Sequence, residues 1–249
     1  MGIGRDGVKF TGRIRLMVIG AIAVLKSIFL LYYLRMHTDS SLGYWEMLFG
    51  GLQAAEGRVI LFVVIQTLPD FLFYYFVGGY IGELKDNYVY IFVRERNMKY
   101  WIRRFTVRSL SEILFYQAAA ALLLFVAGIC LQRGVFIEPG RFVFLFLCQF
   151  VKISVFMVFC NILFFRINEL MAVYADLVIQ ALPPFAVGVL YDTEGAWRLA
   201  VKYVPFNWCS YSYVQQAGLD PVVMLCLLMA AGMLSYWYLE KLFSNYEVV

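Results

Sequence analysis

Three ionisable side chains lie inside stretches of the sequence that are otherwise apolar. Lys26, Asp70 and Lys152 each fall near the middle of an apolar run of about twenty residues. An ionised side chain at the centre of a bilayer costs about 2.5–3.5 kcal/mol on insertion scales, so such residues normally face the interior of a helix bundle and pair there. One acid and two bases at similar depth therefore predict an ion pair of Asp70 with Lys26, with Lys152, or with both.

Several roles are open for these charges. A structural ion pair would fix the register of the helices, whereas charges that line a cavity would form a pathway for a substrate or water. A titrating Asp70 could couple transport to an ion, although a paired aspartate tends to stay ionised. Pro69 removes a backbone donor beside Asp70 and predicts a kink. Two further acids, Glu112 and Asp176, lie near predicted helix ends, where we expect water to reach them.

The residues needed for several familiar active sites are absent. His37 is the only histidine, so an HExxH zinc site is excluded, and a Ser-His-Asp triad could be built on His37 alone. The sequence also lacks GxxxxGK[ST], the loop that binds nucleotide phosphates. The five cysteines have no metal or redox spacing and are expected to be small buried hydrophobes. We therefore predict no catalytic residues, no metal site and no cofactor on this chain.

The composition predicts an all-α polytopic membrane protein. Of the 249 residues, 63% are hydrophobic, compared with about 45–50% in ordinary soluble domains, and the apolar residues are spread along the whole chain. A spanning helix needs about 20 apolar residues. Six segments reach that length within one transmembrane domain (1–249), at roughly 16–34, 59–82, 110–131, 142–165, 170–191 and 221–239.

The basic residues predict the orientation of these six spans. With both termini on one side, thirteen Lys and Arg lie on that side and six on the other. Cytoplasmic loops carry the excess of Lys and Arg, so we expect both termini to be cytoplasmic. The net charge of +4 does not indicate a nucleic-acid partner, because the basic residues adjoin the spans.

Two polar segments are expected to lie at the membrane surface. Arg5, Lys9 and Arg13 recur every four residues, which is typical of an interfacial helix on the inner surface; a disordered basic tail is the alternative. Residues 192–218 are rich in Trp and Tyr, which favour membrane interfaces. They predict short re-entrant or extracellular helices before the last span.

The longest strongly charged segment, residues 82–104, separates the second and third predicted spans. The basic residues within it place it on the cytoplasmic side. Its mixture of aromatic and charged residues suits a surface that contacts another protein. A plain positively charged anchor is the alternative.

This arrangement resembles the membrane subunits of type-2 ATP-binding-cassette (ABC) transporters. The shared features are an interfacial helix, six spans, a charged cytoplasmic segment between spans two and three, and an aromatic segment before span six. The run YVYIFVRER at 88–96, leading to KYWI at 99–102, is similar to small permeases of Gram-positive bacteria. Those permeases are linked to export of lantibiotics and other bacteriocins, or to immunity against these antimicrobial peptides.

The resemblance implies a non-catalytic permease in the bacterial cytoplasmic membrane. Such permeases dock on separate ATPase subunits, which hold the ATP and Mg²⁺, and two identical or homologous permeases pair over two ATPases. The expected cargo is an amphipathic or peptide substrate. By position, the coupling element lies within 83–104 and includes Tyr88, Tyr90, Phe92, Arg94, Glu95, Arg96, Lys99 and Trp101.

Other classes of function remain possible on the sequence alone. An ion-driven secondary transporter would use Asp70 as its coupling carboxylate. The scarcity of histidine and the lack of paired acidic motifs argue against a metal-dependent intramembrane enzyme. A receptor or assembly factor would move no solute at all.

Overall fold

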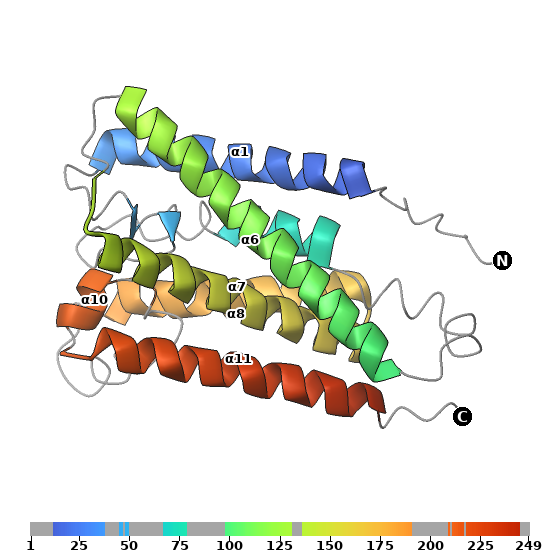
Figure 1. Ribbon diagram of the computed structural model, residues 1–249. Coiled ribbons are helices and arrows are strands. Elements are labelled where there is room, and N and C mark those ends of the chain that lie inside the picture. The colour runs from blue at the N-terminus through green and yellow to red at the C-terminus, as the bar shows by residue number, and fades with distance from the viewer. Residues whose placement is uncertain are drawn as a thin grey trace.

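The described part of the chain consists of helices and short connections, with no strand among the described residues. The computed structural model describes residues 12–37, 45–46, 48–49, 67–78, 98–130, 136–190, 209, 211–216 and 218–244. The long helices are α1 (Gly12–His37), α6 (Met98–Cys130), α7 (Pro139–Arg166), α8 (Glu169–Leu190) and α11 (Pro221–Ser244). A π-helix, η1 (Tyr74–Gly78), continues the helical residues 67–73, and a short helix, α10 (Tyr211–Gln216), precedes α11 (Figure 1).

Four of the described helices are long and apolar enough to cross a bilayer. The candidate spans are Arg13–Tyr32, Ile102–Cys130, Pro139–Phe164 and Pro221–Leu242, and α8 adds a shorter apolar stretch at Leu170–Leu182. The all-α fold is thereby confirmed for the described residues, and the four apolar helices are compatible with a membrane protein. The second predicted span is described only at 67–78.

Short polar signals in the sequence set several helix ends. The Asp220 carboxylate accepts a hydrogen bond from the Val222 N–H at 2.8 Å, and Pro221 occupies the first helical position of α11, where its missing N–H costs nothing. At the start of α8, the Leu170 N–H donates to the side chain of Asn168 at 3.2 Å. Only two residues separate α7 from α8, so these helices form a tight antiparallel hairpin.

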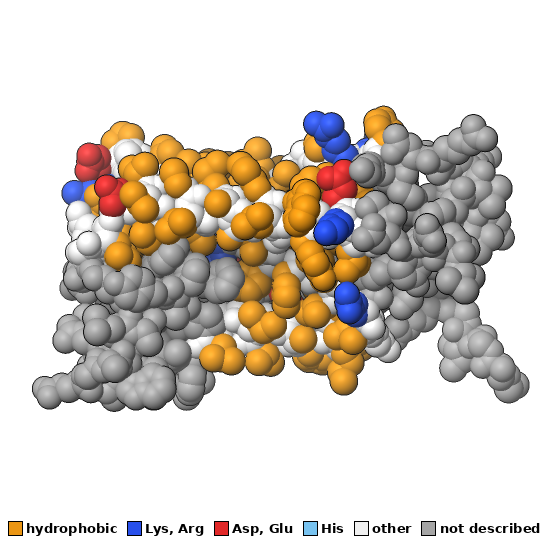
Figure 2. Space-filling view, turned by 90° about the horizontal axis from the view of Figure 1, so that it is seen from below, with side chains coloured by type: hydrophobic (Ala, Val, Ile, Leu, Met, Phe, Trp, Pro, Cys, Tyr) orange, Lys and Arg blue, Asp and Glu red, His pale blue; other side chains and the backbone are white. Residues whose placement is uncertain are grey.

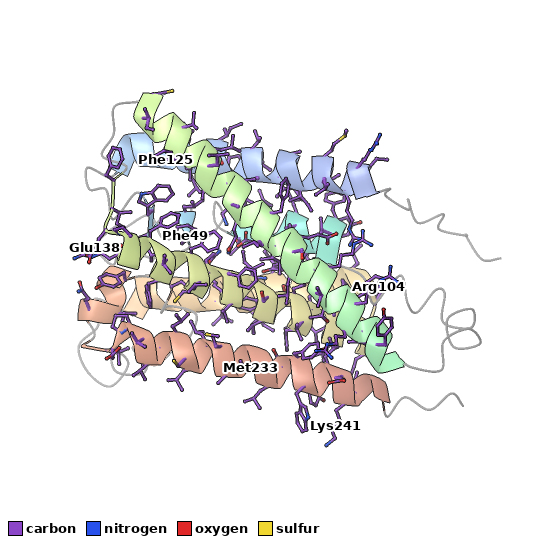
Figure 3. All side chains as sticks on the ribbon, viewed as in Figure 1. Phe49, Arg104, Phe125, Glu138, Met233 and Lys241 are labelled. Atoms are coloured by element: carbon purple, nitrogen blue, oxygen red, sulfur yellow. The ribbon has the colours of Figure 1, made fainter. Side chains whose placement is uncertain are left out.

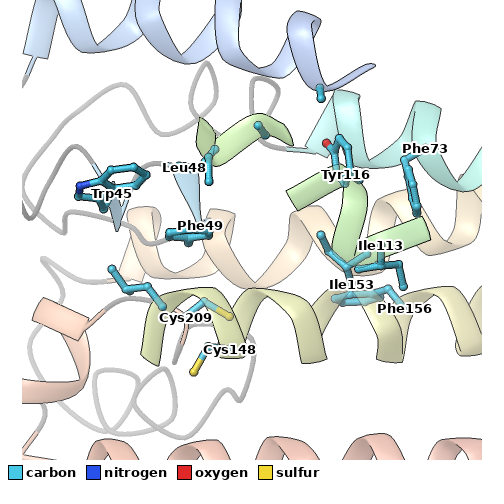
Figure 4. Packing of buried hydrophobic residues seen from close by; sticks show 14 of the residues in the cluster. Trp45, Leu48, Phe49, Phe73, Ile113, Tyr116, Cys148, Ile153, Phe156 and Cys209 are labelled. Carbon is cyan, nitrogen blue, oxygen red and sulfur yellow. The ribbon is translucent and has the colours of Figure 1, made fainter. Parts of the chain in front are cut away.

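Helix α7 is the centre of the bundle. It packs against α6, α8, α11, α10 and η1, while α1 packs against α6 and η1. The buried core follows α7 from an aromatic group at Trp45 and Phe49 to Ile153 and Phe156 (Figure 4). The Trp45 ring meets the Phe142 ring edge-on at 5.0 Å, a favoured geometry for aromatic pairs.

Charged residues gather at the two ends of the bundle. Arg104 and Lys241 lie at the end that holds the start of α1 and the end of α11, whereas Glu138 lies at the other end (Figure 3). By their positions in the helices, the basic residues of that first end, here called the basic end, are Arg13, Arg15, Lys99, Arg103, Arg104, Arg108, Arg166 and Lys241. Figure 2 shows an apolar band between the two charged ends.

The band consists of large apolar side chains that point away from the bundle. On α11 alone, Val222, Met233, Leu234 and Trp237 are each more than half exposed. Soluble monomers rarely expose contiguous apolar patches of more than a few hundred Å². A helix with apolar residues all round is instead typical of a lipid environment.

The start of the chain differs in one respect from the expectation. Helix α1 runs without a break from Gly12 to His37, so Arg13 lies in the first turn of the same helix that forms the span. The candidate span accordingly begins at Arg13. Arg5 and Lys9 lie outside the described residues, as does most of the aromatic segment 192–218.

Gly232 allows α11 to approach α7 closely and provides a test of this packing. A Cβ built on Gly232 would lie 3.5 Å from Val155 Cγ2 and 3.7 Å from Val151 Cγ1, so alanine fits but a larger side chain does not. We expect Gly232→Ile to destabilise the protein by about 1–3 kcal/mol through overpacking, measured as a lower thermal midpoint in detergent. Gly20→Ile in α1 is the matched control, because Gly20 has open space around it. Equal losses in both variants would contradict the close approach.

Candidate functional site

The predicted ion pair lies in the interior of the bundle. The Lys26 ammonium on α1 is 3.0 Å from Asp70 Oδ1 on the helical segment 67–73. The Tyr116 hydroxyl on α6 donates to the same oxygen at 2.9 Å. Lys26 is 2% exposed and Asp70 5%, so both charges are removed from solvent. The pairing of Asp70 with Lys26 is confirmed, and Tyr116 is a third member that the sequence did not indicate.

Aromatic packing fixes the position of Tyr116. Its ring stacks on Phe73 with 4.8 Å between the ring centroids (Figure 4), and the Lys26 ammonium lies 5.3 Å from the Tyr116 ring centroid. Tyr74, which follows Phe73 in the chain, begins η1. Its hydroxyl donates a hydrogen bond to the carbonyl of Ile153 on α7 at 3.4 Å. The pair is thus held between α1, the segment 67–78 and α6, with α7 behind it.

Lys152 is not part of this pair. It is half-buried on α7, and no acid of the described segments lies within ion-pair distance of it. It lies instead close to Cys209: burial raises the pKa of the Cys209 thiol, and the Lys152 charge opposes that shift. The alternative in which Asp70 pairs with Lys152 is therefore wrong. The rotation of α7 about its axis turns the Lys152 side chain toward Cys209 instead.

A second charged cluster connects α1, α6 and η1 near the basic end. Glu112 Oε1 on α6 lies 3.3 Å from Arg15 Nε on α1 and 3.1 Å from Arg108 Nε one turn earlier on α6. The Arg15 guanidinium also donates to the carbonyl of Val77 in η1. Glu112 is buried, so the expectation that water would solvate it is wrong. Two arginines replace the water and hold the carboxylate inside the bundle.

Asp176 is the second acid that was expected to reach water and does not. It is 1% exposed, and the Gln180 side chain donates to its Oδ2 at 2.7 Å. Its Oδ1 has no hydrogen-bond partner, and neither does the side-chain amide of Gln117 or Gln149, although both glutamines are buried. Unpartnered buried polar atoms are uncommon. The interior of this bundle therefore holds more polar side chains than the packing of its helices requires.

The residues expected to couple to an ATPase lie mostly outside the described part of the chain. This holds for Tyr88, Tyr90, Phe92, Arg94, Glu95 and Arg96. Lys99 and Trp101 fall in the first turns of α6, and their side chains are not described. The adjoining Arg103 and Arg104 are exposed at the basic end, while Ile102 between them and Trp101 is buried.

The cysteines follow the expectation in part. Cys148, Cys160 and Cys209 are buried, but Cys130 and Cys226 are exposed on the outer surface of the bundle, and all five are free. Across the described helices, no group of three or more His, Cys, Asp or Glu side chains could hold a metal ion.

The two charged groups of the described residues position the helices relative to one another. The Lys26–Asp70–Tyr116 group connects α1, the segment 67–73 and α6. The Arg15–Glu112–Arg108 group connects α1 to α6, and Arg15 also bonds to Val77 of η1. No protein family, curated protein or solved structure matches this chain.

The Lys26–Asp70 pair can be tested with a double-mutant cycle. Asp70→Ala leaves the Lys26 charge buried and unpaired, which should cost about 3–5 kcal/mol of stability and lower the folded yield. Adding Lys26→Met should restore most of the loss, because the second change removes the orphaned charge. Adding Lys152→Met instead should restore nothing, since Lys152 is not a partner.

Glu138→Ala is the control for this cycle. Glu138 pairs with Arg141 at 2.9 Å, but its side chain is 65% exposed, and such surface pairs contribute about 0–1 kcal/mol. Thermal unfolding in detergent measures all the variants. Rescue by Lys152→Met, or equal losses at Asp70 and Glu138, would contradict the geometry.

Proposed function

We propose that this chain is the permease subunit of an ATP-driven transporter of the type-2 ABC kind, driven by separate ATPase subunits that bind at the basic end. The observation that carries the proposal is the Arg15–Glu112–Arg108 cluster. It connects α6, which begins within the expected coupling segment, to α1 directly and to η1 through Val77. A displacement of the start of α6 would therefore act on both neighbouring elements.

The deeper ion pair extends this connection into the membrane interior. Lys26 lies eleven residues beyond Arg15 on α1, about 16 Å along the helix axis, and Tyr116 lies one turn beyond Glu112 on α6. Both polar groups therefore bind α1 to α6, and both also engage the segment 67–78. This arrangement supports a rigid unit that moves as a whole when its basic end is pushed.

The π-helix supports a conformational role for the segment beside the ion pair. Single-turn π-helices are rare and occur frequently at functional sites. Here η1 begins four residues after Asp70 and receives the Arg15 hydrogen bond on Val77. A segment with non-standard hydrogen bonding is a suitable place for a change of helix shape between two transport states.

The complete architecture is part of the proposal. We propose six spans, of which α1, α6, α7, α8 and α11 are five and the segment around 67–78 belongs to the sixth. The gathering of basic residues at one end supports cytoplasmic termini in a bacterial inner membrane. The sequence resemblance supports a second permease subunit, identical or homologous, and an amphipathic or peptide substrate of the lantibiotic or bacteriocin type.

The pairing of Asp70 weighs against an ion-coupled secondary transporter. A coupling carboxylate must gain and lose its ion during transport, but removal of the charge on Asp70 would leave Lys26 unpaired in the interior. Asp70 is therefore better suited to hold the helices in place than to carry a proton.

The orientation predicts a pattern of chemical labelling. In a background without native cysteines, Arg104→Cys should resist a membrane-impermeant maleimide added to intact cells and react after permeabilisation. Glu138→Cys, at the opposite end of the bundle, should react in both cases. Labelling of Arg104→Cys on intact cells would overturn the proposed orientation.

The ATPase dependence is tested by purification with native partners and reconstitution. An ATPase subunit should co-purify, and peptide transport in liposomes should require ATP. Reversal of charge at Arg94 and Arg96 should reduce transport about tenfold or more, the equivalent of about 1.4 kcal/mol of coupling, while ATP hydrolysis and membrane insertion persist. Lys241→Glu is the matched control for a basic charge outside the coupling segment. Transport driven by an ion gradient without the ATPase would favour the secondary transporter instead.

A further inference from the structure

A long apolar groove opens on the side of the bundle near the basic end. It has a volume of about 440 Å³ and lies between α6, α7 and α11, within the range of about 300–1,000 Å³ that small-molecule sites occupy. Its α6 wall runs from Arg103 to Leu110, about 10 Å along the helix axis. Its position on the outer surface makes it accessible from the surrounding lipid.

The walls of the groove are apolar over most of its length. Phe150, Val151 and Val158 of α7 form the floor, and the lips are Val107 of α6 and Met233 of α11. Val107 is 58% exposed and Met233 66%, so neither lip is covered by another described helix. Such a surface fits a hydrocarbon chain.

One end of the groove is polar and positively charged. Arg103 and Tyr236 line this end, and Arg103 makes no ion pair with any acid in the described segments. Thr106 also lines the groove, with its hydroxyl oxygen buried. Glu240 lies close enough to Tyr236 to influence it, but it is not part of the lining. Arg104 and Lys241 add to the positive charge of this end.

We propose that the groove binds one acyl chain of an anionic phospholipid, with the lipid phosphate on the Arg103 guanidinium. An acyl chain satisfies the apolar walls, and the phosphate satisfies the unpaired arginine. An apolar helix would cover the walls but would supply no counterion for the charged end. Basic pockets between helices on the cytoplasmic side are suited to anionic head groups.

The proposal does not depend on the ATPase and is tested on the purified chain alone. The protein in mild detergent is titrated with phosphatidylglycerol or phosphatidylcholine, and bound lipid is counted by native mass spectrometry. Phosphatidylglycerol should bind more tightly, and Arg103→Gln should weaken it about tenfold, the effect of losing one hydrogen bond between charged groups. Arg104→Gln is the matched control, because Arg104 is exposed beside the groove but does not line it.

A second pair of variants tests the groove itself. Val107→Trp should fill the groove and abolish binding of phosphatidylglycerol, whereas Val126→Trp, at an equally exposed position farther along α6, should have no effect. Equal binding of the two lipids, or unchanged binding in Arg103→Gln, would overturn the proposal. It would also be overturned if Val107→Trp dissociated a dimer and left lipid binding intact, because the groove would then be an interface between two copies of this chain.

Discussion

The structure depends on one requirement: the charges of Lys26 and Asp70 must stay together inside an apolar bundle. Either charge alone would be an uncompensated ion at low dielectric, which is far less favourable than the pair. The 3.0 Å contact therefore fixes α1 against the segment 67–73. The hydrogen bond from Tyr116 then fixes α6 against both. The register of these three elements follows from this interaction, and the aromatic core around Phe73 is built on it.

The two polar clusters differ in how easily they can rearrange. The deep pair is almost completely buried, so its separation would expose charges to hydrocarbon. At the basic end, Arg108 is 46% exposed, and water can replace its bond to Glu112 at little cost. The bundle therefore combines a fixed interior with one solvent-exposed charge at the basic end, where the buried Arg15–Glu112 contact still holds α1 to α6. That combination suits a protein whose driving force acts at one membrane surface.

The sequence predicted apolar helices and a buried ion pair of Asp70 with Lys26, Lys152 or both, because apolar length and the cost of buried charge are properties of the residues themselves. It could not choose between Lys26 and Lys152, since that choice depends on how α7 is rotated. Nor could it select Tyr116 among eighteen tyrosines. The sequence did contain a local indication that Glu112 and Asp176 could be buried. Arg108 precedes Glu112 by four residues and Gln180 follows Asp176 by four, the spacing at which side chains on one helix face meet. Arg15, which completes the Glu112 site, comes from another helix and had no such signal.

The groove lies between two parts of the bundle that are held together by different kinds of contact. On one side, α6 is bound by polar contacts to α1 and the segment 67–78. On the other, α11 rests on α7 through the close approach at Gly232, and Gly232 itself lines the groove. A shift of α6 relative to α11 would change the width of the groove, so a lipid bound there would favour whichever state fits its chain. By reciprocity, a force that moves the start of α6 would alter the affinity for that lipid. The same polar contacts that would carry motion inward from the basic end would thus also make the bundle sensitive to the membrane around it.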